Sequence, residues 1–400
     1  MVPLLSGLKV VDITSIILGP LVGQILGDLG ADVTKVEPVD GELGRTVHPV
    51  AAPGMSAMFA NNNRNKRSLA LDLKSERGKD VLRRLISQSD VLLHNMRVEA
   101  IERLGFGFEA VKALNPSIIH CSAIGFGQGG RYRDRPAFDD VIQAASGLAG
   151  LSARIGGDPA YVPSVVADKV SALYTVYGIL AAVAGQARNG TGAVAIESPM
   201  FESLVSFVLN EHLAAASFKP EPEQAGYHRL FSPNRRPYRT RDGWVAVLPY
   251  TGLQWHRVLV EIGRADLVEA SWFADAAERS RRIDQLYGAL AEELADRTTA
   301  EWLEVFARLD VPHARISDLD DLLDDPHLAD VGFFAPNGTE GAGTVRALRQ
   351  PVLFHGLPQQ ADLPAPGIGA DSRAVLRSLG FEPVDIEALI AAGVVRSGPA

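Results

Sequence analysis

LSGLKVVDITSIILGPLVGQILGDLGADVTKVE, residues 5–37, places two short runs rich in β-branched residues on either side of a longer apolar segment. The runs LKVVDI (8–13) and DVTKVE (32–37) are typical of strands, and the segment 20–29 between them is typical of a helix. Because a strand, a crossover helix and a second strand make up the unit of a parallel sheet, the stretch predicts a βαβ unit at the start of the chain.

The same alternation continues through the first half of the chain. Further strands are expected at 68–73, 90–94, 117–122 and 193–198. Helices are expected between and after them at 76–88, 98–104, 138–148, 169–188 and 200–218. Apolar runs without alternation indicate strands that are covered on both faces. The sequence therefore predicts an α/β fold with a mostly parallel, doubly wound sheet.

The composition changes after residue 218. The stretch KPEPEQAGYHR (219–229) is polar, contains Pro and Gly, and is typical of a linker. A β-like segment at 244–248 and helical segments at 254–262, 283–296 and 299–309 follow, whereas 335–364 is loop-like and the tail at 371–392 is helical. We expect a large domain in 1–218, a small α+β domain in 225–330, and a segment 335–400 that returns to the large domain.

Composition excludes several classes of protein. A net charge of −9 argues against nucleic acid as the main partner. The single cysteine, Cys121, cannot form an internal disulfide, which favours a reducing cytoplasm. We expect no signal peptide, and apolar stretches such as 172–187 look too short and too broken for a membrane span. The nine histidines are scattered without a Cys/His cluster, so no metal site is expected.

A glycine-rich pattern, GFGQGG at 125–130, follows a predicted strand. A dinucleotide-binding fingerprint with this spacing also opens a helix and is followed about twenty residues later by an acidic residue. Here RYRDRP, ending in Pro136, comes next. We therefore interpret the glycines as a turn that shapes a substrate loop.

The basic run NRNKR at 63–67 has two interpretations. It is either a solvated charged loop or a group of cations that binds phosphates. Asp168 also has two interpretations. It stands where an apolar run gives way to a helix rich in small residues. One interpretation is an N-cap, and the other, which is compatible with the first, is a nucleophile whose carboxylate the helix N-terminus keeps ionised near neutral pH.

Longer motifs resemble class III CoA-transferases (the CaiB–BaiF type, similar to formyl-CoA transferases). The matching segments in the first half are LSGLKVVDIT, GPLVGQILGDLGADVTKVEP, NNNRNKRSLALDLKSERG, DVLLHNMR, ERLGFGFEAVKALNPSIIHCSAIGFGQGG and ADKVSALYTVYGILAAV. In the second half they are YRTRDGWVAV, DDPHLAD and GAGTVR. The resemblance extends from Leu5 to about Gly380, nearly the whole chain.

This resemblance implies a Rossmann-like large domain, a small domain and an interlocked homodimer. It implies that Asp168 is the catalytic residue. The positions that match CoA-contacting residues of the family are Lys74, Asn95, Met96 and Arg103. Two positions depart from the family pattern: Met96 replaces an aromatic residue, and Pro38 replaces an arginine that lies against adenine. A glycine-rich active-site loop of some members is not matched, and LFSPNRRPYRT at 230–240 lies where it is expected.

The implied reaction moves CoA from an acyl-CoA donor to a small carboxylic acid through covalent aspartyl intermediates. Acyl-CoA and the acid are then the partners, with CoA as substrate and no prosthetic group. Backbone N–H groups near the start of the Asp168 helix are the expected oxyanion donors.

Two other functions share the resemblance. An α-methylacyl-CoA racemase needs a base, and Phe138 stands where the histidine of that motif would be. A catalytically inactive protein that binds CoA thioesters is the other alternative. We also expect Asp139 and Arg235 to contact substrate. Arg229, Arg235 and Arg236 could bind a second carboxylate and so favour a dicarboxylate, or they could be exposed arginines of a linker.

Overall fold

The computed structural model describes residues 1–218, 224–339 and 343–398, and the chain divides into two compact units. The large unit comprises Met1–Leu148, Tyr161–Phe207 and Ala329–Ala400. The small unit comprises Ala149–Ala160 and Val208–Leu328. The larger segment of the small unit, Val208–Leu328, thus begins inside a helix rather than at the expected linker, which lies partly outside the described residues.

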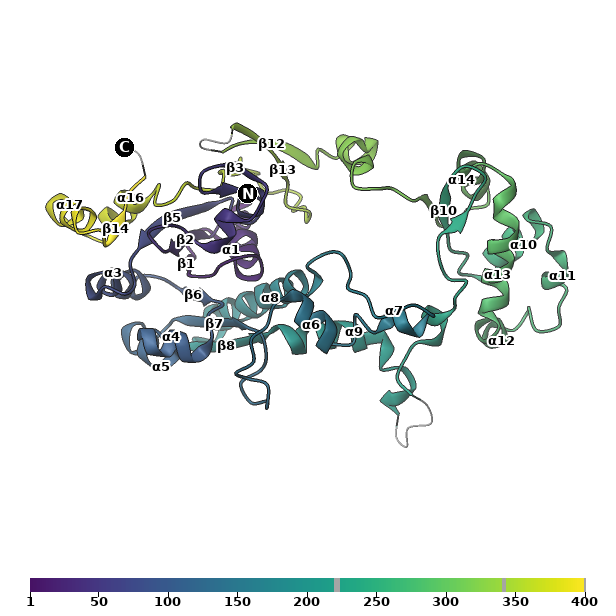
Figure 1. Ribbon diagram of the computed structural model, residues 1–400, viewed down its shortest axis with the longest axis horizontal. Coiled ribbons are helices and arrows are strands. Elements are labelled where there is room, and N and C mark those ends of the chain that lie inside the picture. Colours follow the sequence, from purple (N-terminus) through teal and green to yellow (C-terminus); the bar gives the residue numbers. More distant parts are fainter. Residues whose placement is uncertain (219–223, 340–342, 399–400) are drawn as a thin grey trace. The chain divides into compact units, whose positions relative to one another are not determined.

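A seven-stranded sheet with the order β14-β5-β2-β1-β6-β7-β8 forms the centre of the large unit (Figure 1). All neighbours are parallel except β14, which runs antiparallel to β5. The strands are β1 (Lys9–Asp12), β2 (Asp32–Glu37), β5 (Lys66–Leu71), β6 (Val91–His94), β7 (Ile119–Ile124), β8 (Val194–Pro199) and β14 (Val395–Arg396). The prediction of an α/β fold with a mostly parallel sheet is confirmed.

Most helices of the large unit follow the strands in the expected alternation. The helices are α1 (Leu18–Asp28), α2 (Ala57–Asn62), α3 (Glu76–Ser87), α4 (Val98–Leu104), α5 (Phe108–Leu114), α6 (Asp139–Ala145), α8 (Val166–Asn189), α9 (Met200–His212), α15 (Pro326–Asp330), α16 (Ser372–Ser378) and α17 (Pro383–Ala391). Of these, α2, α5 and α15 were not expected. α3 shows why the pattern works: Val81, Leu82, Leu85 and Ile86 lie on one face and are buried in the core of the large unit.

The strand order reverses direction at β1. The chain passes from β1 to β2 and β5 on one side, and then crosses to β6, β7 and β8 on the other side of β1. In open parallel sheets of this kind the carboxyl ends of the two strands at the reversal diverge, and ligands bind in the resulting crevice. The topology therefore places a site beyond the ends of β1 and β6.

The C-terminal tail completes the large unit. β14 pairs with β5, and the N–H of Asp371 donates to the carbonyl of Ser68 (Figure 1). The helical tail expected at 371–392 is two helices, because Gly380 adopts φ +80° after α16 and the N–H of Phe381 closes the helix end on the carbonyl of Leu376.

The expectation of a loop at 335–364 is wrong in part. β12 (Phe334–Thr339) and β13 (Gly343–Leu348) form an antiparallel hairpin, of which residues 340–342 lie outside the described part of the chain. A second hairpin of β3 (Val50–Ala52) and β4 (Met55–Ser56) was also missed. Gly and Pro within and beside these short strands hide the strand signal.

The small unit has a core of its own around the buried side chains of Trp255, Tyr287 and Trp302. Its sheet has the order β11-β10-β9, with β9 (Tyr238–Arg239), β10 (Trp244–Val247) and β11 (His313–Arg315). Its helices, apart from the end of α9 and part of α15, are α7 (Leu151–Arg154), α10 (Gly252–Glu261), α11 (Ala265–Val268), α12 (Ala276–Arg281), α13 (Ile283–Glu293) and α14 (Thr299–Arg308).

Helix α8 is longer than the helix expected at 169–188. By length and composition it could cross a membrane, with a mean hydropathy of 1.4 over its best 18-residue window and 28% of that window buried. It nevertheless packs against α1, α6, β7 and β8 within the large unit. Leu173 and Tyr177 on α8 are about 60% exposed, so the helix presents an apolar face outward.

Candidate active site

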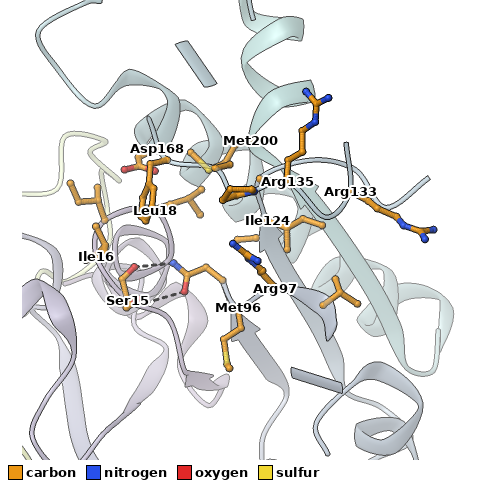
Figure 2. Close-up of a pocket in the computed structure, with 18 of the residues that line it drawn as sticks. Ser15, Ile16, Leu18, Met96, Arg97, Ile124, Arg133, Arg135, Asp168 and Met200 are labelled. Carbon is orange, nitrogen blue, oxygen red and sulfur yellow. Dashed lines mark hydrogen bonds between the residues drawn. The ribbon is translucent and has the colours of Figure 1, made fainter. Parts of the chain in front are cut away.

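A pocket of about 300 Å³ lies beyond the ends of β1, β6 and β7, at the reversal of strand order (Figure 2). Side chains from six separate segments line it. They are Ser15, Ile16, Ile17, Leu18, Asn95, Met96, Arg97, Val98, Ala123, Ile124, Gly125, Gln128, Arg133, Arg135, Pro136, Ala137, Phe138, Asp168 and Met200.

Asn95 joins the two strands that diverge at the pocket. Its Oδ1 accepts a hydrogen bond from the N–H of Ser15 at 3.1 Å, and its Nδ2 donates to the carbonyl of Ser15 at 2.9 Å (Figure 2). Both polar groups of the amide are therefore engaged with the turn after β1. The structure thus gives Asn95, a predicted CoA contact, a positioning role.

The turn that follows β1 is strained. Ile16 adopts φ +74°, which is unfavourable for a β-branched residue. Its N–H donates to Oε2 of the buried Glu42 at 3.1 Å, and Lys35 donates to the carbonyl of Thr14 at 2.9 Å. Buried polar side chains therefore hold this strained turn at the edge of the pocket.

Asp168 is the third residue of α8 and does not cap it. Helix α8 begins at Val166, its N-cap position is Val165, and no side-chain capping hydrogen bond is made there. The capping interpretation is therefore wrong. Figure 2 shows the carboxyl of Asp168 at one end of the pocket, near Leu18 and Met200.

A buried network holds the backbone of Asp168 in place. Oδ1 of Asp139 accepts a hydrogen bond from the N–H of Asp168 at 3.0 Å, and Oδ2 accepts from Nε2 of Gln143 at 2.6 Å. Gln143, fully buried, also bonds to the backbone of Val162 and Ser164 just before α8. Asp139, the predicted substrate contact, thus lies behind Asp168 with both of its oxygens engaged.

The electrostatic expectation for Asp168 is also wrong. Burial and the adjacent carboxylate of Asp139 raise the pKa of Asp168 to about 7, against the weaker opposite effect of Lys169. The helix N-terminus therefore does not keep this carboxyl fully ionised near neutral pH. Moreover, the N–H of Asp168 is bonded to Asp139 and is not free to stabilise an oxyanion.

The glycine-rich stretch forms a turn at the pocket, as predicted. The N–H of Gly127 donates to Glu202 at 3.0 Å, and that of Gln128 donates to Glu197 at 2.9 Å. A Cβ on Gly125 would lie 2.4 Å from the Cβ of Ala137, and one on Gly127 would lie 2.5 Å from Glu202. Glycine is required at 125 because a side chain there would overlap Ala137, whereas at 127 the closest group is only the end of the Glu202 side chain.

The basic run at 63–67 fits neither of its two interpretations. Arg64 is bonded to Asp28, and Lys66 lies 2.8 Å from Asp12, all four residues being buried. Arg67 pairs with Asp32. Burial lowers the pKa of Lys66 to about 8, with Asp12 acting against it. Arg64 and Lys66 thus neutralise buried carboxylates and are not available to phosphates, whereas the pair of Arg67 and Asp32 is partly exposed.

The other predicted CoA contacts lie in different surroundings. Met96 lines the pocket and packs against the core of the large unit. Lys74, after β5, and Arg103, in the last turn of α4, are exposed and have no ion-pair partner among the described residues. Pro38 is exposed at the end of β2. Arg235 is exposed in the small unit.

The sequence reasoning missed three arginines of the pocket, Arg97, Arg133 and Arg135, all of them exposed. Arg97 follows Asn95 and Met96 directly after β6, and a polar residue after a parallel strand was the signal that could have identified it. Arg133 and Arg135 lie in the segment that excluded a dinucleotide fingerprint.

Histidine is missing from the pocket lining within the described part of the chain, and Phe138 lines the pocket at the position considered for a base. His94 lies at the end of β6, fully buried, and burial lowers its pKa to about 3. In the described ranges, no cluster of three His, Cys, Asp or Glu side chains could hold a metal ion.

The fold and the site together define a class of protein. A pocket at the reversal of a parallel sheet contains a carboxyl with a strongly raised pKa, an apolar wall and arginines at its edge. Such an arrangement is typical of an enzyme whose substrate is partly apolar and carries anionic groups.

Comparison with known proteins identifies the family within this class of enzymes. The model of CoA-transferase family III matches residues 5–372. A probable fatty acyl-CoA transferase of Mycobacterium tuberculosis is 31% identical, with 93% of this chain and 97% of that protein aligned. A succinate–glutarate CoA-transferase of Agrobacterium fabrum is 28% identical, with 94% and 96% aligned.

A solved structure agrees with these relatives. The crystal structure of a CaiB/BaiF family protein from Brucella suis superposes with a TM-score of 0.80 at 28% identity, covering 95% of this chain and 100% of that one. The chain belongs to CoA-transferase family III and is an enzyme of the CoA-transferase type, as the sequence motifs predicted.

Proposed function

We propose that the enzyme transfers CoA from an acyl-CoA to a small carboxylic acid through covalent intermediates on Asp168. The observation that carries this proposal is the position of Asp168. Its carboxyl lines the pocket at the point where the strand order of the sheet reverses, and Asp139 accepts a hydrogen bond from its backbone N–H. A carboxylate with a pKa of about 7 is a stronger nucleophile than an ordinary aspartate and is still substantially ionised at neutral pH.

The proposed reaction is a sequence of acyl exchanges that requires no net proton transfer. The Asp168 carboxylate attacks the carbonyl of the donor thioester, which forms a mixed anhydride and releases CoA thiolate. The thiolate attacks the carbonyl of Asp168, releasing the donor acid as its carboxylate and leaving an aspartyl-CoA thioester. The acceptor carboxylate attacks this thioester to give a second anhydride, and the returning thiolate takes the new acyl group and regenerates Asp168.

Every intermediate in this sequence reacts with water, so the site has to exclude it. The apolar residues Ile16, Leu18 and Met200 near Asp168 support such exclusion. Because the N–H of Asp168 is engaged by Asp139, the tetrahedral oxyanions must find donors elsewhere on the pocket wall.

The substitution Asp168→Asn tests the proposal. It removes the anionic nucleophile with little change in shape, and we expect transfer to fall by at least about a thousandfold because covalent catalysis is lost. Wild-type enzyme quenched during turnover should yield an Asp168 peptide that carries CoA, measured by mass spectrometry.

Asp140→Asn, at an exposed position in the first turn of α6, is the matched control and should retain activity and the adduct. Near-normal transfer by Asp168→Asn, with mass spectrometry excluding deamidation to aspartate, would contradict the mechanism. Binding of acyl-CoA without transfer to any acid would instead indicate an inactive binding protein.

A further inference from the structure

Aliphatic side chains line the pocket that contains Asp168, and Figure 2 shows Leu18 and Met200 beside its carboxyl. Ile17, Leu18, Ile124 and Met200 each line the pocket while at most 8% of each residue is exposed. They come from the turn after β1, the start of α1, the end of β7 and the start of α9. The acyl chain of a bound thioester must lie near Asp168 when the carboxylate attacks, so these residues form its surroundings.

Unlike these aliphatic side chains, Arg133 and Arg135 are directed away from Asp168 (Figure 2), and the charged group behind Asp168 is acidic. Arg133 is paired with the exposed Asp134. Behind Asp168 lies a second carboxylate, Asp139. Lys169 is exposed and donates to Ser164. A second carboxylate on the acyl group would lose its hydration among aliphatic groups and be repelled by two acidic residues.

The size of the pocket limits the acyl group as well. Ligand pockets usually range from about 300 to about 1,000 Å³, and this one, at about 300 Å³, is at the lower end. It can hold an acyl group with the reacting end of CoA, whereas the phosphates and the nucleotide must extend beyond it.

We infer that the acyl group this enzyme transfers is short, aliphatic and uncharged, so that its acids are monocarboxylates rather than dicarboxylates. The inference rests on the proposed function and departs from the dicarboxylate suggested by Arg229, Arg235 and Arg236. Arg229 donates to the hydroxyl of Tyr287 at 2.8 Å within the small unit. Arg97, the remaining arginine of the pocket, then binds the anionic part of CoA.

Acids matched in carbon number test the inference directly. Butyrate is compared with succinate and pentanoate with glutarate, each with acetyl-CoA and with succinyl-CoA as donor, and the product acyl-CoA is measured by mass spectrometry. We expect kcat/KM to favour the monocarboxylate in each pair by about tenfold or more, because an unpaired charge is costly to bury. An equal or higher value for the dicarboxylate would overturn the inference, whereas no transfer to any acid would count against the proposed function instead.

Two methionines of the same pocket provide a matched pair of variants. Figure 2 shows Met200 beside Asp168 and the side chain of Met96 directed away from it. Met200→Ala should shift the preference from butyrate toward hexanoate by about tenfold, the usual effect of one or two methylenes. Met96→Ala should leave the ratio of the two acids unchanged. Met200→Leu, which conserves volume, serves if the alanine variant does not fold.

An unchanged chain-length preference in both Met200 variants would show that the acyl group lies elsewhere. Arg97→Gln separates the two possible partners of this arginine. If Arg97 serves CoA, the KM for every acyl-CoA rises by a similar factor. A loss of kcat/KM confined to succinate and glutarate would show that Arg97 binds the distal carboxylate of a dicarboxylate, and the inference would be wrong.

Discussion

At the scale of single residues, the environment of Asp168 opposes its charge. Burial and Asp139 raise the pKa of its carboxyl to about 7 from an ordinary value of 3.8. Only the ionised form can attack a thioester. The same features that make Asp168 a good nucleophile therefore destabilise the folded protein when it is ionised.

The first consequence concerns activity. We expect kcat/KM for CoA transfer to fall about tenfold per pH unit below a midpoint near the pKa of about 7, because protonated Asp168 does not attack. In Asp139→Asn, which removes the adjacent charge, the midpoint should move to lower pH. A pH–rate profile measured with one acyl-CoA tests both. A midpoint near 4 in the wild type would contradict the assignment.

The second consequence concerns stability. A carboxyl whose folded pKa lies above its unfolded pKa stabilises the fold fully below pH 3.8, and this contribution is lost as the pH rises through about 7. Asn at position 168 has no such dependence. Asp168→Asn should therefore raise the Tm relative to wild type at pH 8 and have little effect at pH 4, each pKa unit corresponding to about 1.4 kcal/mol. Equal shifts at both pH values, measured by thermal unfolding, would contradict the raised pKa.

Lys74 and Arg103 remain predicted CoA contacts, and their exposure is compatible with that role. Alanine at either position should weaken CoA binding by about tenfold, the usual value of a charge-assisted hydrogen bond, and leave the Tm unchanged. Calorimetry at two salt concentrations measures the effect, since salt should weaken wild-type binding. Arg83→Ala, at an arginine paired with Glu76 and Asp80, is the control. Unchanged affinity in both test variants would exclude them as contacts.

At the scale of elements, α6 holds the start of α8. The side chains of Asp139 and Gln143, one turn apart on α6, bond to the N–H of Asp168 and to the segment before it. Neither residue needs to contact substrate to affect the reaction. The backbone of the nucleophile is therefore positioned by a neighbouring helix.

Gln143→Leu tests this positioning. It keeps the approximate volume and removes the hydrogen bonds to Asp139, Val162 and Ser164, leaving the buried Oδ2 of Asp139 and partly buried backbone groups unpaired. We expect unfolding to become about 1–3 kcal/mol easier and kcat to fall more than the affinity for CoA. Gln186→Leu, which removes hydrogen bonds to Ser117 and Gly192, is the matched control and should leave kcat unchanged. A normal kcat in Gln143→Leu would show that the segment is held by other contacts.

At the scale of the whole molecule, the prediction of an interlocked homodimer remains open. The exposed apolar residues Leu173, Tyr177 and Phe207 on α8 and α9 favour a second copy of the chain as a partner. Threaded chains cannot separate without unfolding, so light scattering should give a constant dimer mass on dilution. A monomer that appears at low concentration under native conditions would contradict the prediction.

Much of the fold could be predicted because the central strands are short runs rich in β-branched and aliphatic residues that alternate with helical stretches. Strands β1, β2, β5, β6, β7 and β8 each lie within about two residues of the predicted positions. The hairpin of β12 and β13 was missed because Gly and Pro within its strands hide the strand signal. Within the site, Asp168, Asn95 and Met96 were predicted and line the pocket, whereas Arg97, Arg133 and Arg135 were not anticipated.

The sequence by itself determined the alternation of strands and helices, the family and the identity of the candidate nucleophile, because these depend on local patterns and on long ordered motifs. The tertiary structure alone decided the charge states. It paired Lys66 with Asp12 and Arg64 with Asp28, so that cations for which phosphate binding was one of two interpretations are buried in ion pairs. It also buried Asp168 and placed Asp139 behind it, and together burial and the adjacent carboxylate raise a pKa that the helix N-terminus was expected to lower. The physical reason is that desolvation and Coulomb interaction depend on distances between residues far apart in the chain, and no local pattern records those distances.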